Sequence, residues 1–130
     1  MLKIFIMSLV LSMGLLASDL PWLHSYDEAL RVAKKEHKDI YVFIGADVCR
    51  WCDRYKEQTL SKKEVIDRLN EEFVLVYLSR DRHKVPEYFE TQGVPRHYFL
   101  RSDGTLIHSD RGGKEVDGLF SMLDEVDVKR

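Results

Sequence analysis

Runs of consecutive apolar residues mark two segments of the chain, 40–44 and 73–78. Both runs are rich in β-branched and aromatic residues and are too short for buried helices, so they predict strands that are covered on both faces. Segments 97–100 and 105–108 flank the turn sequence Ser102-Asp103-Gly104. This arrangement predicts two further short strands that form an antiparallel hairpin.

Apolar residues at helical spacing predict helices around these strands. Ser25 followed by Glu28 has the spacing of a capping box and predicts the start of a first helix. A second helix is expected to begin at residue 49 and to end near residue 60. Ser61 and Glu64 repeat the capping-box spacing and predict a third, shorter helix that ends near residue 70.

The last part of the chain predicts two more helices. One is a short helix over 85–92, with Pro86 in its first turn and Gly93 after its end. The other has its apolar face between Val116 and Leu123. The strand, helix, strand order of the first half favours a parallel pair with a right-handed crossover. The whole order predicts an α/β fold, a three-layer sandwich in which helices flank a central mixed β-sheet.

The first eighteen residues differ from the rest of the chain, because Lys3 is followed by an apolar run over 4–16. This run is shorter than the roughly 20 residues that cross a bilayer as a helix, and Ala17 and Ser18 offer small residues for cleavage. We therefore predict a signal peptide over 1–18 and one domain over 19–130. The alternative is an uncleaved membrane anchor. An exported chain of this kind is periplasmic in a bacterium, where disulfides persist.

Length and charge narrow the class of protein. A chain of 130 residues suits one small globular domain. Its formal net charge is −2, and removal of segment 1–18, in which Lys3 is the sole charged side chain, makes the charge one unit more negative. Mild acidity of this kind argues against nucleic acid as a partner.

Cys49 and Cys52 are the two cysteines of the chain, and they lie between the first predicted strand and the start of a helix. The free N–H groups and the dipole of a helix N-terminus stabilise a thiolate at Cys49, and Arg50 adds a cation beside it. Cys52 follows one turn later, where it can attack a mixed disulfide formed at Cys49. The spacing therefore predicts a redox-active disulfide with Cys49 as the attacking and Cys52 as the resolving thiol.

Other uses of the cysteine pair are less well supported. A structural disulfide that closes so short a loop gains only about 2 kcal/mol, against about 3 kcal/mol for a 15-residue loop. A zinc site lacks a second cysteine pair or a close pair of histidines, and a copper site lacks Met or His residues near the motif. Haem attachment requires a histidine where the chain has Asp53. We expect neither a metal nor a cofactor.

A C-x-x-C motif after a buried strand, followed later by Gly93-Val94-Pro95 before a hairpin, resembles the thioredoxin superfamily. Within this pattern, segments 47–57 and 73–78 and the helix-helix segment around 60–61 resemble exported thioredoxin-related proteins whose motif ends in Trp-Cys. This resemblance implies a thioredoxin-like fold, a cis Pro95 that faces the disulfide, and a substrate-binding surface of Trp51, Val94 and Pro95.

The resemblance also implies an activity, the exchange of disulfides with protein thiols, in which reduction is slightly favoured over oxidation or isomerisation. Its partners would be protein thiol or disulfide substrates and an electron-exchange partner, such as a membrane thiol–disulfide transporter. The alternative from another class is a non-catalytic thioredoxin-fold binding module with a structural disulfide.

Three departures from the thioredoxin pattern bear on redox direction and rate. Val48 stands where many thioredoxins have Trp, and the dipeptide Arg50-Trp51 replaces Gly-Pro. Phe43 takes the place of the buried acid that assists deprotonation of the second thiol in those proteins.

Several residues near the motif have two interpretations. Trp51 and Tyr55 lie one helical turn apart and would form an aromatic lip for a partner, unless Tyr55 is ordinary packing at the helix surface. His97 would either tune the Cys49 thiolate or pack in the core. The basic run 80–84 would attract an acidic partner or form a solvated loop.

Overall fold

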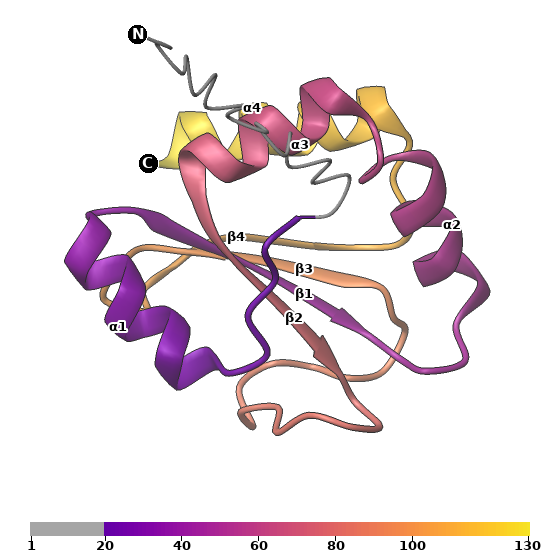
Figure 1. Cartoon of the computed structure of the whole chain (residues 1–130), viewed down its shortest axis with the longest axis horizontal. Coiled ribbons are helices and arrows are strands. Elements are labelled where there is room, and N and C mark those ends of the chain that lie inside the picture. Colours follow the sequence, from indigo (N-terminus) through magenta and orange to yellow (C-terminus); the bar gives the residue numbers. More distant parts are fainter. Residues whose placement is uncertain (1–19) are drawn as a thin grey trace, which may run out of the picture.

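The computed structural model of the protein describes residues 20–130, so the predicted signal peptide and its cleavage site lie outside the described residues. Four strands form one sheet in the order β2-β1-β3-β4 (Figure 1). Their bounds are β1 (Asp39–Gly45), β2 (Phe73–Ser79), β3 (Arg96–Leu100) and β4 (Leu106–Arg111). β1 is parallel to β2 and antiparallel to β3, and β4 is antiparallel to β3. The predicted mixed sheet is confirmed.

Helices cover both faces of this sheet, as the three-layer prediction requires. Figure 1 shows α1 (Tyr26–Glu36) on one side and α2 (Arg50–Gln58), α3 (Lys63–Glu72) and α4 (Val116–Lys129) on the other. Alternate side chains of β1 enter the two cores: Val42 packs with α1, and Phe43 packs with the other three helices. The apolar runs are continuous because each strand buries both of its faces. Among the helices of residues 20–130, none has the length and apolar character needed to cross a membrane.

The two predicted capping boxes have opposite outcomes. Ser25 is the N-cap of α1, and its hydroxyl accepts a hydrogen bond from the backbone N–H of Glu28, as predicted. The Ser61 hydroxyl instead donates to the Glu57 carbonyl at 2.6 Å. Ser61 therefore pairs with a carbonyl at the end of the preceding helix. α3 begins after Lys62, whose side chain makes no capping hydrogen bond.

The predicted helix over 85–92 is wrong, because this segment forms a turn instead. The N–H of Phe89 donates to the Pro86 carbonyl, but the N–H of Glu90 donates to the Tyr98 hydroxyl at 2.9 Å. In a helix that amide would bond to the carbonyl of Pro86, four residues earlier. Burial of the Phe89 ring against Tyr26 of α1 and a hydrogen bond to β3 therefore replace helical pairing.

Candidate redox site

Cys49 and Cys52 form a disulfide with Cα atoms 5.2 Å apart. The chain leaves β1 at Gly45, and Cys49 is the N-cap of α2 with an extended backbone. The backbone N–H of Cys52 donates to Cys49 Sγ at 3.1 Å. Cys52 is fully buried, whereas Cys49 is half-buried. The pair thus has an outer sulfur that faces the surface and an inner sulfur enclosed by the core.

The N-cap position explains why the outer sulfur is suited to carry negative charge. The first N–H groups of a helix have no intrahelical partner, and the helix dipole is positive at this end. Both effects favour a thiolate over a thiol at Cys49. The Arg50 side chain is exposed, and its guanidinium carbon lies 5.8 Å from the centre of the Trp51 ring.

The segment before Cys49 is hydrogen-bonded to the end of β2 and to the loop that follows it. One carboxylate oxygen of Asp47 accepts hydrogen bonds from the Ser79 hydroxyl at 2.8 Å and from Arg82 Nε at 2.6 Å. The backbone N–H of Asp47 donates to Asp81 at 2.8 Å. The hydrogen bonds from Arg82 and Ser79 hold the pKa of Asp47 below its usual value. The basic run 80–84 is therefore hydrogen-bonded to Asp47, just before the C-x-x-C motif. Neither of the two sequence interpretations of this run included such a contact.

Side chains around Cys49 form an exposed apolar rim. Val48 is 93% exposed and Trp51 is 53% exposed. Tyr55 is only 1% exposed, so it is not part of an exposed lip, although it lines the same cavity as Trp51. It lies on the buried face of α2 with Cys52, and its ring is 5.2 Å from the ring of Phe43.

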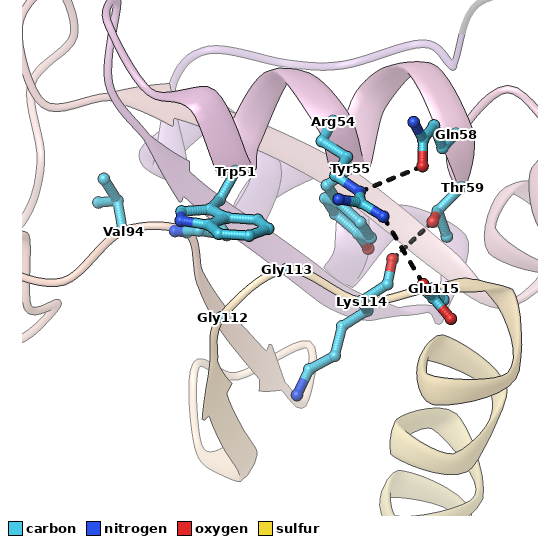
Figure 2. Close-up of a pocket in the computed structure, with 11 residues that line it drawn as sticks. Trp51, Arg54, Tyr55, Gln58, Thr59, Val94, Gly112, Gly113, Lys114 and Glu115 are labelled. Atoms are coloured by element: carbon cyan, nitrogen blue, oxygen red, sulfur yellow. Dashed lines mark hydrogen bonds and ion pairs between the residues drawn. The ribbon is translucent and has the colours of Figure 1, made fainter.

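A cavity of about 370 Å³ lies beside Trp51, between α2 and the connection from β4 to α4 (Figure 2). Val94 and Pro95 line it together with Trp51, so the structure places these three residues at one cavity. The Val94–Pro95 peptide bond is cis. We call this cavity the groove. Gly112 and Gly113 form its wall opposite α2, and its far end is polar, with residues such as Arg54, Lys114 and Glu115.

A chain of buried hydrogen bonds runs behind the groove. The hydroxyls of Tyr55 and Tyr41 are 2.8 Å apart, Tyr41 Oη lies 2.6 Å from His97 Nδ1, and His97 Nε2 lies 2.8 Å from the Gly112 carbonyl oxygen. A carbonyl only accepts, so Nε2 carries a proton. Burial lowers the pKa of His97 to about 4, so the ring is neutral and Nδ1 accepts from Tyr41. Burial also raises the pKa values of both phenols.

These contacts decide between the two interpretations of His97. Both ring nitrogens are engaged within the protein, and the side chain is fully buried, so His97 is a core residue with two hydrogen bonds. No sequence pattern indicated a role for Tyr41, because it lies inside an apolar run, and the glycine pair 112–113 was also not among the predicted site residues. The glycine pair, directly after the hairpin, was the available signal for a backbone that approaches another element closely.

Comparison with known proteins agrees with this geometry. A model of the family described as Thioredoxin-like matches residues 21–102. The chain therefore belongs to the thioredoxin-like family, and the resemblance seen in the sequence is confirmed.

Two curated relatives show how much of a longer protein the chain covers. Disulfide bond reductase DsbH of Chlamydia pneumoniae is 41% identical over 104 residues, which are 77% of this chain and 62% of that protein. Spermatogenesis-associated protein 20 of Rattus norvegicus is 37% identical over 60 residues, which are 46% of this chain and 8% of that protein. The chain thus spans less than two thirds of each of these relatives.

Solved structures with the same fold cover most of the chain. A thioredoxin from Thermus thermophilus superposes with a TM-score of 0.71 at 24% identity, over 85% of this chain and 88% of the other. A structure described as DsbH Oxidoreductase superposes with a TM-score of 0.67 at 23% identity, over 86% and 87% of the two chains. At these identities the comparison establishes the thioredoxin-like fold.

Proposed function

We propose that the protein is an exported thiol–disulfide oxidoreductase that acts on protein disulfides through Cys49 and Cys52, in the reducing direction. The observation that carries this proposal is the asymmetry of the pair. Cys49 is half-buried at a helix N-terminus, two residues before Trp51, which lines the groove, whereas Cys52 is enclosed. A nucleophile needs access to its substrate, and a resolving thiol needs access only to the nucleophile.

The reaction proceeds through two exchanges. The Cys49 thiolate attacks one sulfur of a substrate disulfide, which forms a mixed disulfide and breaks the substrate S–S bond. The released substrate thiolate takes up a proton. Cys52 then loses its proton to solvent and attacks Cys49 Sγ as a thiolate, which forms the Cys49–Cys52 disulfide and breaks the mixed disulfide; the second substrate sulfur leaves as a thiolate and takes up a proton. The substrate gains two electrons and two protons, and the protein loses them.

The proposed substrate surface is Trp51, Val94 and Pro95 at the groove. An extended peptide on this surface would lie beside Cys49, with the Trp51 ring as an apolar contact and the backbone of Val94 as a hydrogen-bonding partner. Arg50 is proposed to favour the Cys49 thiolate by its positive charge. Each turnover leaves the disulfide form, so a reducing cycle needs an electron-exchange partner, for which a membrane thiol–disulfide transporter is a suitable class.

The reduction potential of the Cys49–Cys52 pair tests this function. The purified domain is equilibrated in graded glutathione buffers, and free thiols are counted by mass. A value near about −270 mV supports a reductase, and one near or above about −180 mV would replace it with an oxidant or isomerase. A pair that stays oxidised well below about −300 mV would instead identify a structural disulfide in a binding module.

Single substitutions separate the two cysteine roles. Cys49→Ser is expected to abolish reduction of a protein disulfide such as that of insulin. Cys52→Ser is expected to accumulate the mixed disulfide, visible as a mass increase that dithiothreitol reverses. Retained activity in the Cys49→Ser protein would rule out the proposed mechanism.

The proposed export of the protein by a cleaved signal peptide can be tested separately. Expression of the complete chain in a bacterium, followed by fractionation and mass measurement, is expected to yield a periplasmic protein that begins near Asp19. A membrane-bound product that keeps residues 1–18 would support the anchor instead.

A further inference from the structure

The connection between β4 and α4 forms the groove wall that faces α2, and Gly112 and Gly113 bring it close to the cysteine helix (Figure 2). Gly112 has a φ of 95°, a conformation that favours glycine. A Cβ built on Gly113 would lie 3.7 Å from the backbone oxygen of Trp51. The wall therefore runs directly past the first turn of α2, where an approaching substrate would meet both.

Three hydrogen bonds hold this wall in place. The N–H of Gly112 donates to the Pro95 carbonyl at 2.8 Å, which joins the wall to the loop that carries the cis bond. The Gly112 carbonyl accepts from His97 Nε2 at 2.8 Å. The Thr59 hydroxyl donates to the Lys114 carbonyl at 2.5 Å. The imidazole is completely buried between the sheet and α2, and Thr59, at the end of α2, is buried as well.

The same imidazole also reaches the helix that carries the cysteines. His97 Nδ1 accepts from Tyr41 of β1, and the Tyr41 hydroxyl is hydrogen-bonded to Tyr55, three residues after Cys52 on α2. All three side chains are almost completely buried. A neutral imidazole presents a donor and an acceptor on opposite sides of a rigid ring, which an aliphatic side chain cannot do.

We infer that His97 is a positioning residue for the proposed exchange: it holds the Gly112–Gly113 wall at a fixed distance from α2, so that the groove keeps the shape of an extended substrate. This role rests on the proposed function. His97 does not act on the sulfurs, because both of its nitrogens are engaged elsewhere. A groove that is already ordered reduces the ordering cost of binding, and loss of that order weakens binding of a large substrate more than the chemical step.

The test compares His97→Leu with His97→Gln, whose amide nitrogen can still reach the Gly112 carbonyl. Tyr98→Phe is the matched control, because Tyr98 is the next residue of β3 and its hydroxyl bonds to Glu90 on the other face of the sheet. Steady-state reduction is measured with insulin and dithiothreitol as reductant. Reduction of the small disulfide 5,5′-dithiobis(2-nitrobenzoic acid) is measured separately as a single turnover of the pre-reduced protein after dithiothreitol has been removed. Hydrogen exchange of segment 111–115 is followed by mass spectrometry.

For His97→Leu we expect KM for insulin to rise about tenfold with kcat changed less than about twofold, and the rate with the small disulfide to stay within about twofold. Exchange at segment 111–115 should become at least about tenfold faster. In His97→Gln, KM for insulin and the exchange rate at segment 111–115 should both return most of the way to the wild-type values. In Tyr98→Phe, both should stay at the wild-type values. If His97→Leu fails to fold, Tyr41→Phe, which removes the hydroxyl bonded to Nδ1, should give the same changes in smaller degree.

An active His97→Leu protein with unchanged KM for insulin would overturn the inference and leave the proposed function intact. Unchanged exchange at segment 111–115 would also overturn it, because the wall would then be held without the imidazole. If the wild-type protein reduces neither disulfide, the proposed function has failed and the positioning role fails with it. The exchange measurement then shows separately whether His97 holds the wall.

Discussion

Phe43 of β1 and His97 of β3 are direct partners in the antiparallel pairing, and their rings are stacked with centroids 6.0 Å apart and planes 16° apart. Phe43 occupies the position where the thioredoxin resemblance implies a buried acid. The polar group nearest to it in this pairing is an imidazole from the neighbouring strand, which is neutral because burial lowers its pKa to about 4. The two stacked rings are therefore both neutral, and a cation, the ammonium of Lys56, lies 5.9 Å from the centre of the Phe43 ring.

Phe43→Asp is expected to destabilise the protein strongly. The Phe43 side chain is completely buried and packs 5.2 Å from Tyr55 and 5.0 Å from Tyr77, centroid to centroid. Loss of the ring costs about 3–5 kcal/mol, and a carboxylate there adds a desolvation penalty. Burial raises the pKa of the introduced carboxyl, so the desolvation part is absent below about pH 4, grows as the pH rises from about 4 to the raised pKa, and is complete above it. Urea unfolding at about pH 5 and pH 8 measures both parts.

Phe43→Leu serves as the control for that substitution, since it removes volume without adding a titratable group. Its penalty should be smaller and the same at both pH values. Equal penalties for Phe43→Asp at the two pH values would contradict a raised pKa for the introduced carboxyl.

His97 predicts an acid dependence of stability. Its pKa is about 4 in the folded protein, against 6.5 as its ordinary value. Between these pH values the unfolded chain binds more protons than the folded protein. The stability contributed by the neutral His97 ring is therefore complete above about pH 6.5 and is lost as the pH falls toward 4. The loss is about 3 kcal/mol. His97→Gln does not titrate, so the stability difference from the wild type should shrink by that amount between about pH 7 and pH 4, as measured by urea unfolding. A constant difference would show that the ring is not buried as a neutral base.

Two glycine substitutions should have opposite effects on stability. A Cβ at Gly45 would lie 2.9 Å from the side chain of Tyr77, which is itself buried, so Gly45→Ala should cost about 1–3 kcal/mol. A Cβ at Gly118 in α4 would come no closer than 3.9 Å to Lys114, so Gly118→Ala should stabilise the helix by about 0.5–1 kcal/mol. Thermal and urea unfolding of the two variants measure these effects. A stable Gly45→Ala protein would mean that Tyr77 can move away without cost.

Trp51→Ala tests the apolar rim beside Cys49. The indole is 53% exposed and lines the groove, so its removal should raise KM for insulin about tenfold through lost contact area. Tyr88→Ala is the control, because Tyr88 is an aromatic residue of similar exposure, at 63%, on a segment that packs with α1 on the other face of the sheet. Equal effects of the two substitutions would remove Trp51 from the substrate surface.

Much of the fold follows from local sequence patterns. The runs 40–44 and 73–78 predicted the two central strands, because a strand buried on both faces has to be apolar at every position. Ser25 predicted the start of α1, because its cap bond is made within four residues of chain. The position of Cys49 and Cys52 after a strand and at a helix start was predicted for the same reason, since strand and helix signals adjoin there.

The errors occur where a distant or competing partner replaced a local one. The Ser61 hydroxyl bonds to the Glu57 carbonyl at the end of the previous helix, so it does not cap α3. The amide of Glu90 bonds to Tyr98 of β3, so it does not make the helical bond to Pro86. The carbonyl of Glu57 is only four residues from Ser61, so the local pattern offered two competing bonds there, whereas the Tyr98 hydroxyl comes from another element.

By itself, the sequence determined the order of the strands and of most helices along the chain, and the position of the cysteine pair between a strand and a helix. It could do so because periodic burial and helix capping depend on neighbouring residues. Only the tertiary structure decided that Trp51, Val94 and Gly112 line one groove and that His97 joins its wall to Tyr41. These groups come from different elements, and long-range packing of the sheet against α2 brings them together. A buried imidazole between a carbonyl and a phenol depends on that packing, which no short segment of the chain encodes.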